Sequence, residues 1–210
     1  MPDAKRAEHI EQRRKAISEA FHSFHQPLTS LHCGLEIALL RPRTEEDYRK
    51  RIQEALASAG MAFELNKALR ELVDAEDPGE RFGTVAFAPL FAQVLDEVLS
   101  VAAAAEVQVK AAECPNVYIC ADPMKLLRML GNYLAAKANE LEAGGEVAIK
   151  FRVEEGELAI VIATSGTTKP IAESAASAQK CREIRLDAVR NYVETIGGEL
   201  NDNIVKLPIA

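Results

Sequence analysis

A stripe of apolar residues near the N-terminus is the feature that most constrains how this sequence can fold. Its members recur at spacings of three, four and seven residues, which places them on one face of a long α-helix. No glycine or proline interrupts the stripe before Pro27, and it ends at Arg41-Pro42-Arg43, where proline prevents the helix from continuing. Its residues are Ile10, Ile17, Phe21, Phe24, Leu28, Leu31, Leu35 and Leu39.

A second helix is predicted to follow directly. Thr44 is a suitable N-cap because its hydroxyl oxygen can accept a hydrogen bond from the first turn, and the acidic run at 45–47 suits the positive end of the helix dipole. This helix should extend to about Val73. Its inner side is predicted to carry Ile52, Leu56, Phe63, Leu69 and Leu72.

The two helices should form an antiparallel hairpin. The Pro-Gly pair in DAEDPGERFG (74–83) breaks the second helix, so we place a domain boundary there. Residues 1–76 would then form a helical domain and residues 83–210 a second domain. One hairpin leaves its wide apolar face uncovered, whereas two copies would bury it in a four-helix bundle. We therefore expect a homodimer.

The second domain mixes the patterns of helices and strands. Residues 146–165 alternate apolar and other residues on both sides of Glu155-Gly156, which indicates a β-hairpin. The Ala- and Ser-rich stretch around residues 171–179 is predicted to be a loop. The expected fold class is an α/β sandwich, with helices on one face of one sheet. Helices are predicted over 87–106, 123–143 and 184–200, and strands over VQVKAAE, VYICAD and, at a sheet edge, VKLPI.

The composition excludes several classes of partner. A hydrophobic content of 48% supports a packed core, while a net charge of -7 argues against nucleic acid or an anionic membrane surface as the main partner. No apolar run of about 18 residues occurs, so we expect no membrane insertion. The cysteines form no CxxC pair, which is typical of a reduced cytoplasmic protein. They are Cys33, Cys114, Cys120 and Cys181.

Three histidines fall within eleven residues of the first predicted helix. At about 100° per residue, His22 points roughly 150° away from the centre of the apolar stripe, and Gln26 shares this exposed face. His25 and His32 lie on the flanks of the stripe. His32 and its neighbour Cys33 suggest a metal, but no ligand of suitable spacing completes such a site, so we expect both to pack on the helix. From geometry alone, His22 would be an ordinary solvated histidine.

Four segments resemble sensor histidine kinases. His22-Ser23-Phe24-His25-Gln26-Pro27-Leu28-Thr29 is similar to their H-E-L-R-T-P-L-T phosphoacceptor motif. Residues 186–198 are similar to their L-x-x-V-x-x-x-V-x-x-x-G-G helix, and VKLPI to their closing strand. A D-x-x-R-L-x-x-V-L-x-N helix is matched by Asp122, Lys125, Leu126, Met129, Leu130 and Asn132. The resemblance implies a dimerisation hairpin, with His22 as the phosphoryl carrier, followed by a kinase-type ATPase domain.

The resemblance fails where those kinases hold ATP. Ala136 stands at the place of the magnesium-binding asparagine, and alanine offers no oxygen ligand. Thr164 replaces the adenine-binding aspartate, which removes a charge-assisted hydrogen bond of about 1.5–3 kcal/mol. Gly166 remains, but the segment 181–185 has no glycine where a nucleotide lid should begin, so its backbone cannot approach phosphates closely. Asn132 is expected to cap or pack locally. We therefore expect no bound cofactor.

These departures decide the function that the resemblance implies. The kinases place an acidic residue after the histidine, and here that residue is Ser23, which disfavours autophosphorylation. A neutral imidazole can still attack an aspartyl phosphate, which is an activated acyl phosphate. The expected function is a phosphotransferase that relays phosphoryl groups between response-regulator receivers through His22. An upstream histidine kinase is a further possible partner.

Two alternatives remain open. The chain is alternatively a divergent sensor histidine kinase that is active with ATP and magnesium, or a regulator that binds a receiver without chemistry. Gln26 stands where phosphatase-competent relatives carry a residue that orients a hydrolytic water. Its other interpretation is that it simply solvates the helix beside Pro27.

Overall fold

The computed structural model describes residues 2–40, 42, 44–169, 176–201 and 203–210. The chain divides into two compact units. We call residues 1–71 with 171–184 the hairpin unit, and residues 72–170 with 185–210 the sandwich unit. The hairpin unit is therefore not continuous in the sequence. The combination of an N-terminal helical hairpin and a mixed α/β domain confirms the predicted fold class.

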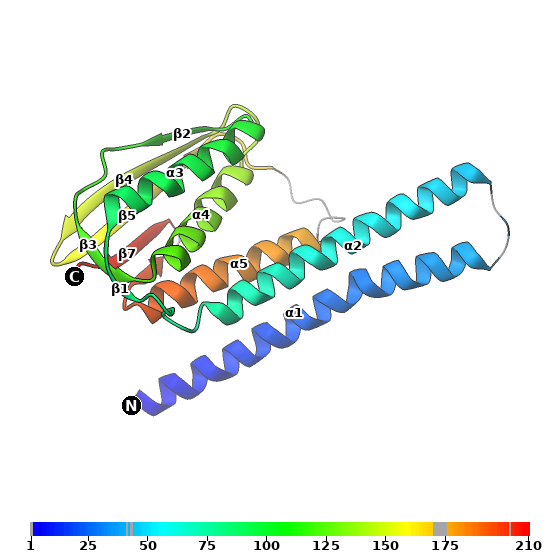
Figure 1. Ribbon diagram of the computed structural model, residues 1–210, viewed down its shortest axis with the longest axis horizontal. Coiled ribbons are helices and arrows are strands. Elements are labelled where there is room, and N and C mark those ends of the chain that lie inside the picture. Colours follow the sequence, from blue (N-terminus) through cyan, green and yellow to red (C-terminus); the bar gives the residue numbers. More distant parts are fainter. Residues whose placement is uncertain (1, 41, 43, 170–175, 202) are drawn as a thin grey trace. The chain divides into compact units, whose positions relative to one another are not determined.

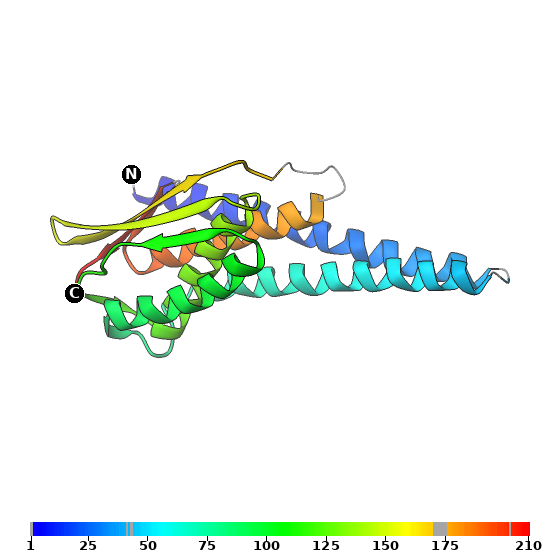
Figure 2. The ribbon, with the colours of Figure 1, turned by 90° about the horizontal axis from the view of Figure 1, so that it is seen from above.

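Two long helices build the hairpin unit. Helix α1 spans Pro2–Leu39 and continues through Pro27, and helix α2 spans Glu45–Asp74. They run antiparallel to each other, as Figures 1 and 2 show. The Asp47 backbone N–H donates to Thr44 Oγ1 over 3.1 Å, which confirms the predicted cap of α2.

The apolar face of this hairpin is only partly covered. Leu65 and Leu69 near the C-terminal end of α2 are buried, whereas Phe63 is 74% exposed and Leu56 67% exposed. On α1, Phe21 is 53% exposed although it lies at the centre of the predicted stripe. The side chains of Ile10 and Ile17 lie outside the described part of the structure. Further large apolar side chains exposed on the two helices are Leu28, Leu35, Ile37, Leu39 and Ile52.

The sandwich unit contains two sheets, not the one sheet that the sequence predicts. A small antiparallel sheet pairs β1 (Gly83–Ala86) with β3 (Tyr118–Ala121). The large sheet has the strand order β2-β4-β5-β7-β6, in which only the β2–β4 pair is parallel. Its strands are β2 (Gln108–Ala111), β4 (Glu146–Glu154), β5 (Glu157–Ser165), β6 (Glu199–Asn201) and β7 (Ile204–Pro208).

The central hairpin of the large sheet forms as predicted. Strands β4 and β5 pair antiparallel over their full length, and Glu155 and Gly156 connect them with φ values of 52° and 83°. Two consecutive left-handed residues match the right-handed twist of the strands they join. The edge position predicted for VKLPI is wrong, because β7 lies between β5 and β6. The short strand β6 was not predicted and takes the edge.

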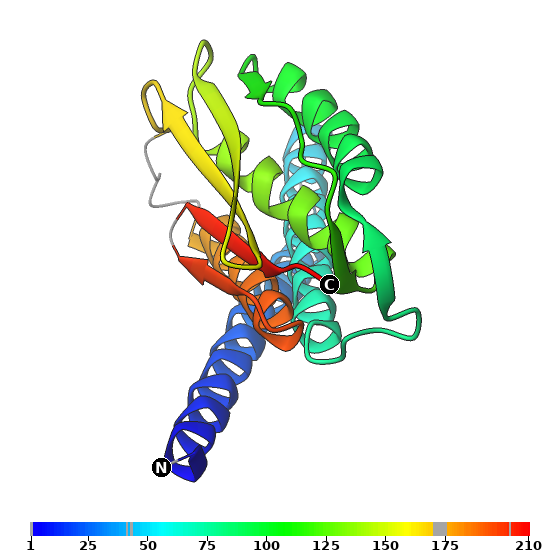
Figure 3. The same cartoon turned by 90° about the vertical axis from the view of Figure 1, so that its left-hand side faces the viewer.

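Helices α3 (Phe87–Ala104) and α4 (Pro123–Asn139) lie side by side over one face of the large sheet, as Figure 3 shows from the end. Helix α3 is long and apolar enough to cross a membrane by length and composition, in contrast to the prediction that no segment inserts into a membrane. It buries Phe87, Phe91 and Val94 in the sandwich core instead, where Phe87 and Phe91 stack at 5.6 Å.

Helix α5 spans Ala176–Thr195 and corrects a second prediction. Residues 176–179 are helical and not a loop, while residues 170–175 lie outside the described part of the chain. The helix serves both units, since its residues up to Ile184 belong to the hairpin unit and those from Arg185 to the sandwich unit. In the sandwich unit it buries Ala188, Val189, Tyr192 and Val193.

Candidate functional site

His22 and Gln26 both have exposed side chains on α1. They are four residues apart and therefore neighbours on the same helix face. The Ser23 hydroxyl donates to the Glu19 backbone carbonyl over 2.9 Å, so the residue after His22 is engaged with its own helix. Pro27 is buried and has no N–H group to donate to the carbonyl four residues earlier. The arrangement leaves the imidazole of His22 accessible to a second macromolecule.

His25 and His32 on α1 are exposed too. His32 Nδ1 lies 3.5 Å from Glu36 Oε2, one helical turn further on. His32, Cys33 and Glu36 each place a possible ligand atom within 4.8 Å of the other two, a grouping that the sequence analysis missed because it did not consider Glu36. All three side chains are exposed and belong to a single helix, and an i,i+4 ion pair accounts for the approach of His32 to Glu36.

An apolar groove of about 300 Å³ lies between α1 and α2. It begins two residues after His22 in the sequence, at Phe24, and its opposite side includes Phe63. Apolar atoms dominate its surface, and Asn66 is its one polar lining residue among those described. The remaining lining residues are Leu28, Leu31, Ala59 and Ala62.

The first half of α5 adds a third helical segment to the hairpin unit. Lys180 Nζ lies 3.2 Å from Glu19 Oε2 on α1. The buried Cys181 places Sγ 3.5 Å from the Glu64 carbonyl oxygen on α2. This segment therefore contacts both helices of the hairpin, at the position in the sequence where the kinases have a nucleotide lid.

The residues of the predicted degenerate nucleotide site lie on α4 and at the end of β5. Asn132 and Ala136 are half-buried one turn apart on α4, while Thr164 and Gly166 are exposed. Gly166 has φ +116°, and a Cβ there would lie 2.9 Å from Gly145 Cα, so this position requires glycine.

The chain that follows β5 is hydrogen-bonded to the residues at the C-terminal end of α4. Glu142 N–H donates to the Thr167 carbonyl over 2.8 Å, and Lys169 N–H donates to the Glu140 carbonyl over 2.8 Å. Leu141 and Thr168 form an isolated bridge between these two bonds. The backbone of 167–169 is thus occupied with structural hydrogen bonds.

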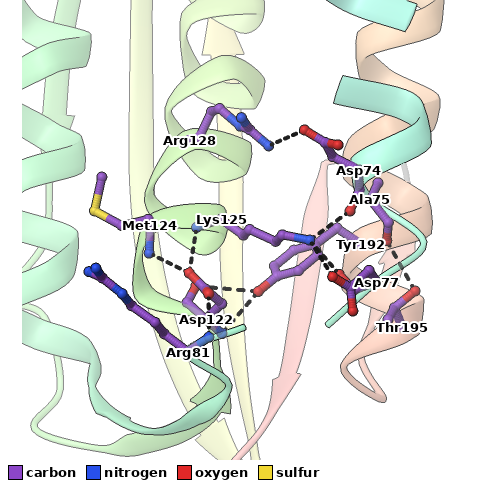
Figure 4. A network of polar contacts seen from close by, with 10 residues as sticks. All are labelled: Asp74, Ala75, Asp77, Arg81, Asp122, Met124, Lys125, Arg128, Tyr192 and Thr195. Carbon is purple, nitrogen blue, oxygen red and sulfur yellow. Dashed lines mark hydrogen bonds and ion pairs between the residues drawn. The ribbon is translucent and has the colours of Figure 1, made fainter. Parts of the chain in front are cut away.

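Asp122 is the centre of a polar network at the start of α4, drawn in Figure 4. Its carboxylate accepts from the backbone N–H groups of Met124 (2.9 Å), Lys125 (3.1 Å) and Arg81 (3.0 Å). Burial raises the pKa of this carboxyl, but the three N–H donors and the nearby Lys125 ammonium outweigh burial and lower its pKa overall. The aspartate is both the N-cap of α4 and an anchor for residues before β1.

Lys125 and Arg128 attach the same helix to the end of α2 (Figure 4). Lys125 Nζ donates to the carbonyls of Asp74 and Asp77, each over 2.9 Å, and Arg128 lies 3.5 Å from the Asp74 carboxylate. Cations at the C-terminal end of a helix are favoured by its dipole and by its unpaired carbonyls. Lys125, which the sequence analysis singled out only as a motif match, therefore has a structural role here.

Tyr192 completes the network from α5. Its hydroxyl accepts from the Asp122 backbone N–H over 3.1 Å, and burial raises the pKa of this phenol to about 12. Thr195 Oγ1 donates to the Ala75 carbonyl over 3.2 Å. No sequence motif indicates these contacts, because the two pairs of partners are separated by 70 and 120 residues in the sequence.

Comparisons with known proteins identify the fold. No protein-family model and no curated protein sequence matches this chain. Among solved structures, the histidine kinase AdeS of Acinetobacter baumannii is similar at 16% identity and a TM-score of 0.58, covering 90% of this chain and 98% of that one.

Two further solved structures are similar. The histidine kinase ThkA in complex with response regulator protein TrrA has a TM-score of 0.67 at 15% identity, with 99% of this chain and 65% of that chain covered. Full-length ShkA in complex with AMPPNP has a TM-score of 0.55 at 16% identity, with 94% and 46% covered. The chain thus has the fold of a histidine kinase core, and the similarity extends over both units.

Proposed function

We propose that this protein is a histidine phosphotransferase of two-component signalling, which carries phosphoryl groups on His22 between response-regulator receivers. The observation that carries the proposal is an exposed histidine, within an H-x-x-x-x-P-L-T segment, on the helical hairpin of a kinase-type fold. A receiver as partner is supported by ThkA, whose solved complex contains a response regulator protein on the same fold.

The transfer follows from the chemistry of the two groups. A nitrogen of the neutral His22 imidazole attacks the phosphorus of an aspartyl phosphate, and the acyl phosphate P–O bond breaks with its electron pair passing to the aspartate carboxylate. The reverse reaction would load a second receiver. The receiver supplies magnesium and a lysine that stabilise the transferring group. His22 needs no acidic neighbour for this step, in keeping with a Ser23 hydroxyl that bonds to the Glu19 carbonyl.

The sandwich unit supports a relay more than a kinase. Its Ala136 and Thr164 offer neither a carboxylate nor an amide for magnesium and adenine, and the chain beyond Gly166 bonds to the end of α4. The segment at the position of the kinases' nucleotide lid is helical and contacts the hairpin through Lys180 and Cys181. We propose that ATP binds weakly, that no cofactor is resident, and that an upstream histidine kinase supplies the phosphoryl group to the first receiver.

A homodimer is part of the proposal. The exposed Phe21, Leu56 and Phe63 belong to the hairpin unit, and an apolar groove of about 300 Å³ lies between its two helices. A second hairpin would remove this surface from water, which is the main driving force of association. With the acidic net charge of -7, we propose a cytoplasmic protein whose binding surfaces are for proteins and not for nucleic acid.

The deciding experiment uses a receiver labelled with radioactive phosphate on its aspartate. Wild-type protein should take up the label and pass it to a second receiver, and His22→Ala should abolish this transfer. His25→Ala is the matched control, because His25 is also exposed on α1 and lies only three residues away. An unlabelled wild-type protein, or label that survives in His22→Ala, would contradict the proposal.

Two further measurements separate the alternatives. Calorimetry with millimolar ATP and magnesium should show no binding, whereas binding together with labelling from ATP would identify a divergent kinase. Receiver binding that is unaffected by His22→Ala and never accompanied by label would identify a regulator without chemistry. Gln26→Ala tests the water-orienting role, since a faster decay of receiver phosphate in wild type than in the variant would assign it.

A further inference from the structure

The ion pair between Lys180 and Glu19 brings a cation from the far end of the sequence to α1. Lys180 Nζ lies 3.2 Å from Glu19 Oε2 and 3.4 Å from Glu183 Oε2, and its side chain is only 27% exposed. The neighbouring Cys181 is buried against the Glu64 carbonyl of α2, which anchors this turn of α5 on the hairpin. The ammonium is therefore held by carboxylates of α1 and α5, on a turn of α5 that Cys181 anchors to α2.

Glu19 lies one helical turn before His22. Residues three apart on a helix have Cβ atoms about 5–6 Å apart. Long side chains lean toward the N-terminus of their helix, so the surface that the imidazole covers is the turn that carries Glu19. The Ser23 hydroxyl donates to the Glu19 backbone carbonyl, whereas Lys180 pairs with the Glu19 carboxylate.

The negative charge of a phosphorylated His22 would interact with the charges of Glu19 and Lys180. A phosphoryl group brings between one and two negative charges near neutral pH, by analogy with about -1.5 to -2 for a phosphorylated hydroxyl. Glu19 alone would repel that charge, whereas Lys180 offsets Glu19 and offers N–H donors. Burial lowers the pKa of Lys180, but hydrogen bonds to Glu19 and Glu183 outweigh burial and raise its pKa overall, so the ammonium persists through the neutral range.

We propose that Lys180 is a phosphoryl-binding residue for His22. Before transfer it neutralises Glu19, and after transfer one of its N–H groups turns to a phosphoryl oxygen on the imidazole. The proposal rests on the proposed function, because it requires a phosphoryl group on His22. It assigns the first half of α5 a part in the relay, in place of the nucleotide lid that the sequence lacks.

Four single variants and one double variant test the proposal in the transfer assay with a phosphorylated receiver. Lys180→Ala should lower the phosphorylated fraction of His22 at equilibrium about tenfold, as expected for the loss of one charge-assisted hydrogen bond. Lys180→Arg should retain most of it. Glu183→Gln is the matched control. It removes the other carboxylate beside Lys180, but Glu183 lies on α5 and not on the helix that carries His22.

Glu19→Gln is expected to increase the phosphorylated fraction, and a misfolded variant would not produce an increase. Removing this carboxylate frees Lys180 and lowers the repulsion, so the phosphorylated fraction and the lifetime of phosphohistidine should both rise. The rise should disappear when Lys180→Ala is added. Thermal unfolding of each variant shows that it is folded.

The outcomes distinguish this inference from the proposed function. If wild type takes up label and Lys180→Ala matches it, the inference is overturned while the relay stands. If Glu19→Gln lowers the phosphorylated fraction, the inference is also overturned. If wild type takes up no label, the proposed function fails and the inference fails with it.

Discussion

The backbone N–H of Arg81 donates to the carboxylate of Asp122 across 3.0 Å, which ties residues 41 positions apart in the sequence. The same carboxylate caps α4, so one buried side chain fixes both a helix start and the chain before β1. Asp122→Ala should lower the free energy of unfolding by about 1–3 kcal/mol, since it leaves three backbone N–H groups without their acceptor. Urea unfolding measures the loss. Asp96→Ala, at an exposed position on α3, should change stability little.

The same aspartate predicts a dependence of stability on pH. Its pKa is lower in the folded protein than in the unfolded chain, so its contribution is fully present above the unfolded value of about 4. The contribution is lost as the pH falls through the folded pKa. The difference in unfolding free energy between wild type and Asp122→Asn should therefore shrink below about pH 4. A difference that grows on acidification would contradict the assigned direction.

Gly79 should not tolerate a side chain. It has φ +108°, and a Cβ there would lie 2.5 Å from Asp122 Cβ. Gly79→Ala should cost about 3 kcal/mol, from the left-handed backbone and from the clash together. Gly144→Ala is the control, because Gly144 has φ +86° but open space around it, and should cost only about 1 kcal/mol. Equal losses in thermal unfolding would show that the clash relaxes freely.

The exposed face of the hairpin predicts the effect of a charge on assembly. Phe63 is 74% exposed and lines the apolar groove, so Phe63→Glu should leave the fold intact while preventing a second copy from covering that face. Light scattering should then give half the mass of the wild type. Phe82→Glu is the control, since Phe82 is an exposed aromatic residue outside the hairpin unit. A wild type that is already monomeric would contradict the homodimer.

The cysteines should react in a definite order with iodoacetamide. Cys33 is exposed and should be modified first, while Cys181 on α5 is buried against α2 and should react only after unfolding. Burial raises the pKa of the Cys114 thiol to about 11, so this half-buried cysteine carries little thiolate at pH 8 and its reaction should accelerate as the pH approaches 11. Mass spectrometry follows each site, and urea-unfolded protein gives the unprotected rates.

Local signals in the sequence were sufficient to predict α2 and the β4–β5 hairpin. Thr44 with the acidic run after it located the start of α2, and Glu155-Gly156 located the turn of the β-hairpin. A helix cap and a hairpin turn each involve only a few consecutive residues, so the local sequence determines them. The face of α1 that carries His22 and Gln26 followed in the same way from helix geometry, and both side chains are exposed.

Distant contacts explain what the sequence did not reveal. Strand β6 has only three residues and depends on its pairing with β7. Because β6 pairs along the outer side of β7, the prediction that β7 is an edge strand was wrong. The Ala- and Ser-rich start of α5 has no apolar stripe of its own to indicate a helix, but Lys180 and Cys181 meet partners on α1 and α2. Lys180 and Glu19 are 161 positions apart in the sequence, so no local sequence pattern could predict that they pair.

The discontinuous hairpin unit has a consequence for synthesis of the chain. The ribosome releases α1 and α2 first, yet the segment 171–184 that completes their unit emerges only after β1 to β5 have been made. Domains usually fold as units in the order of their synthesis. Here α1 and α2 must wait, with Glu19 and Glu64 still lacking Lys180 and Cys181, until the segment 171–184 has been translated.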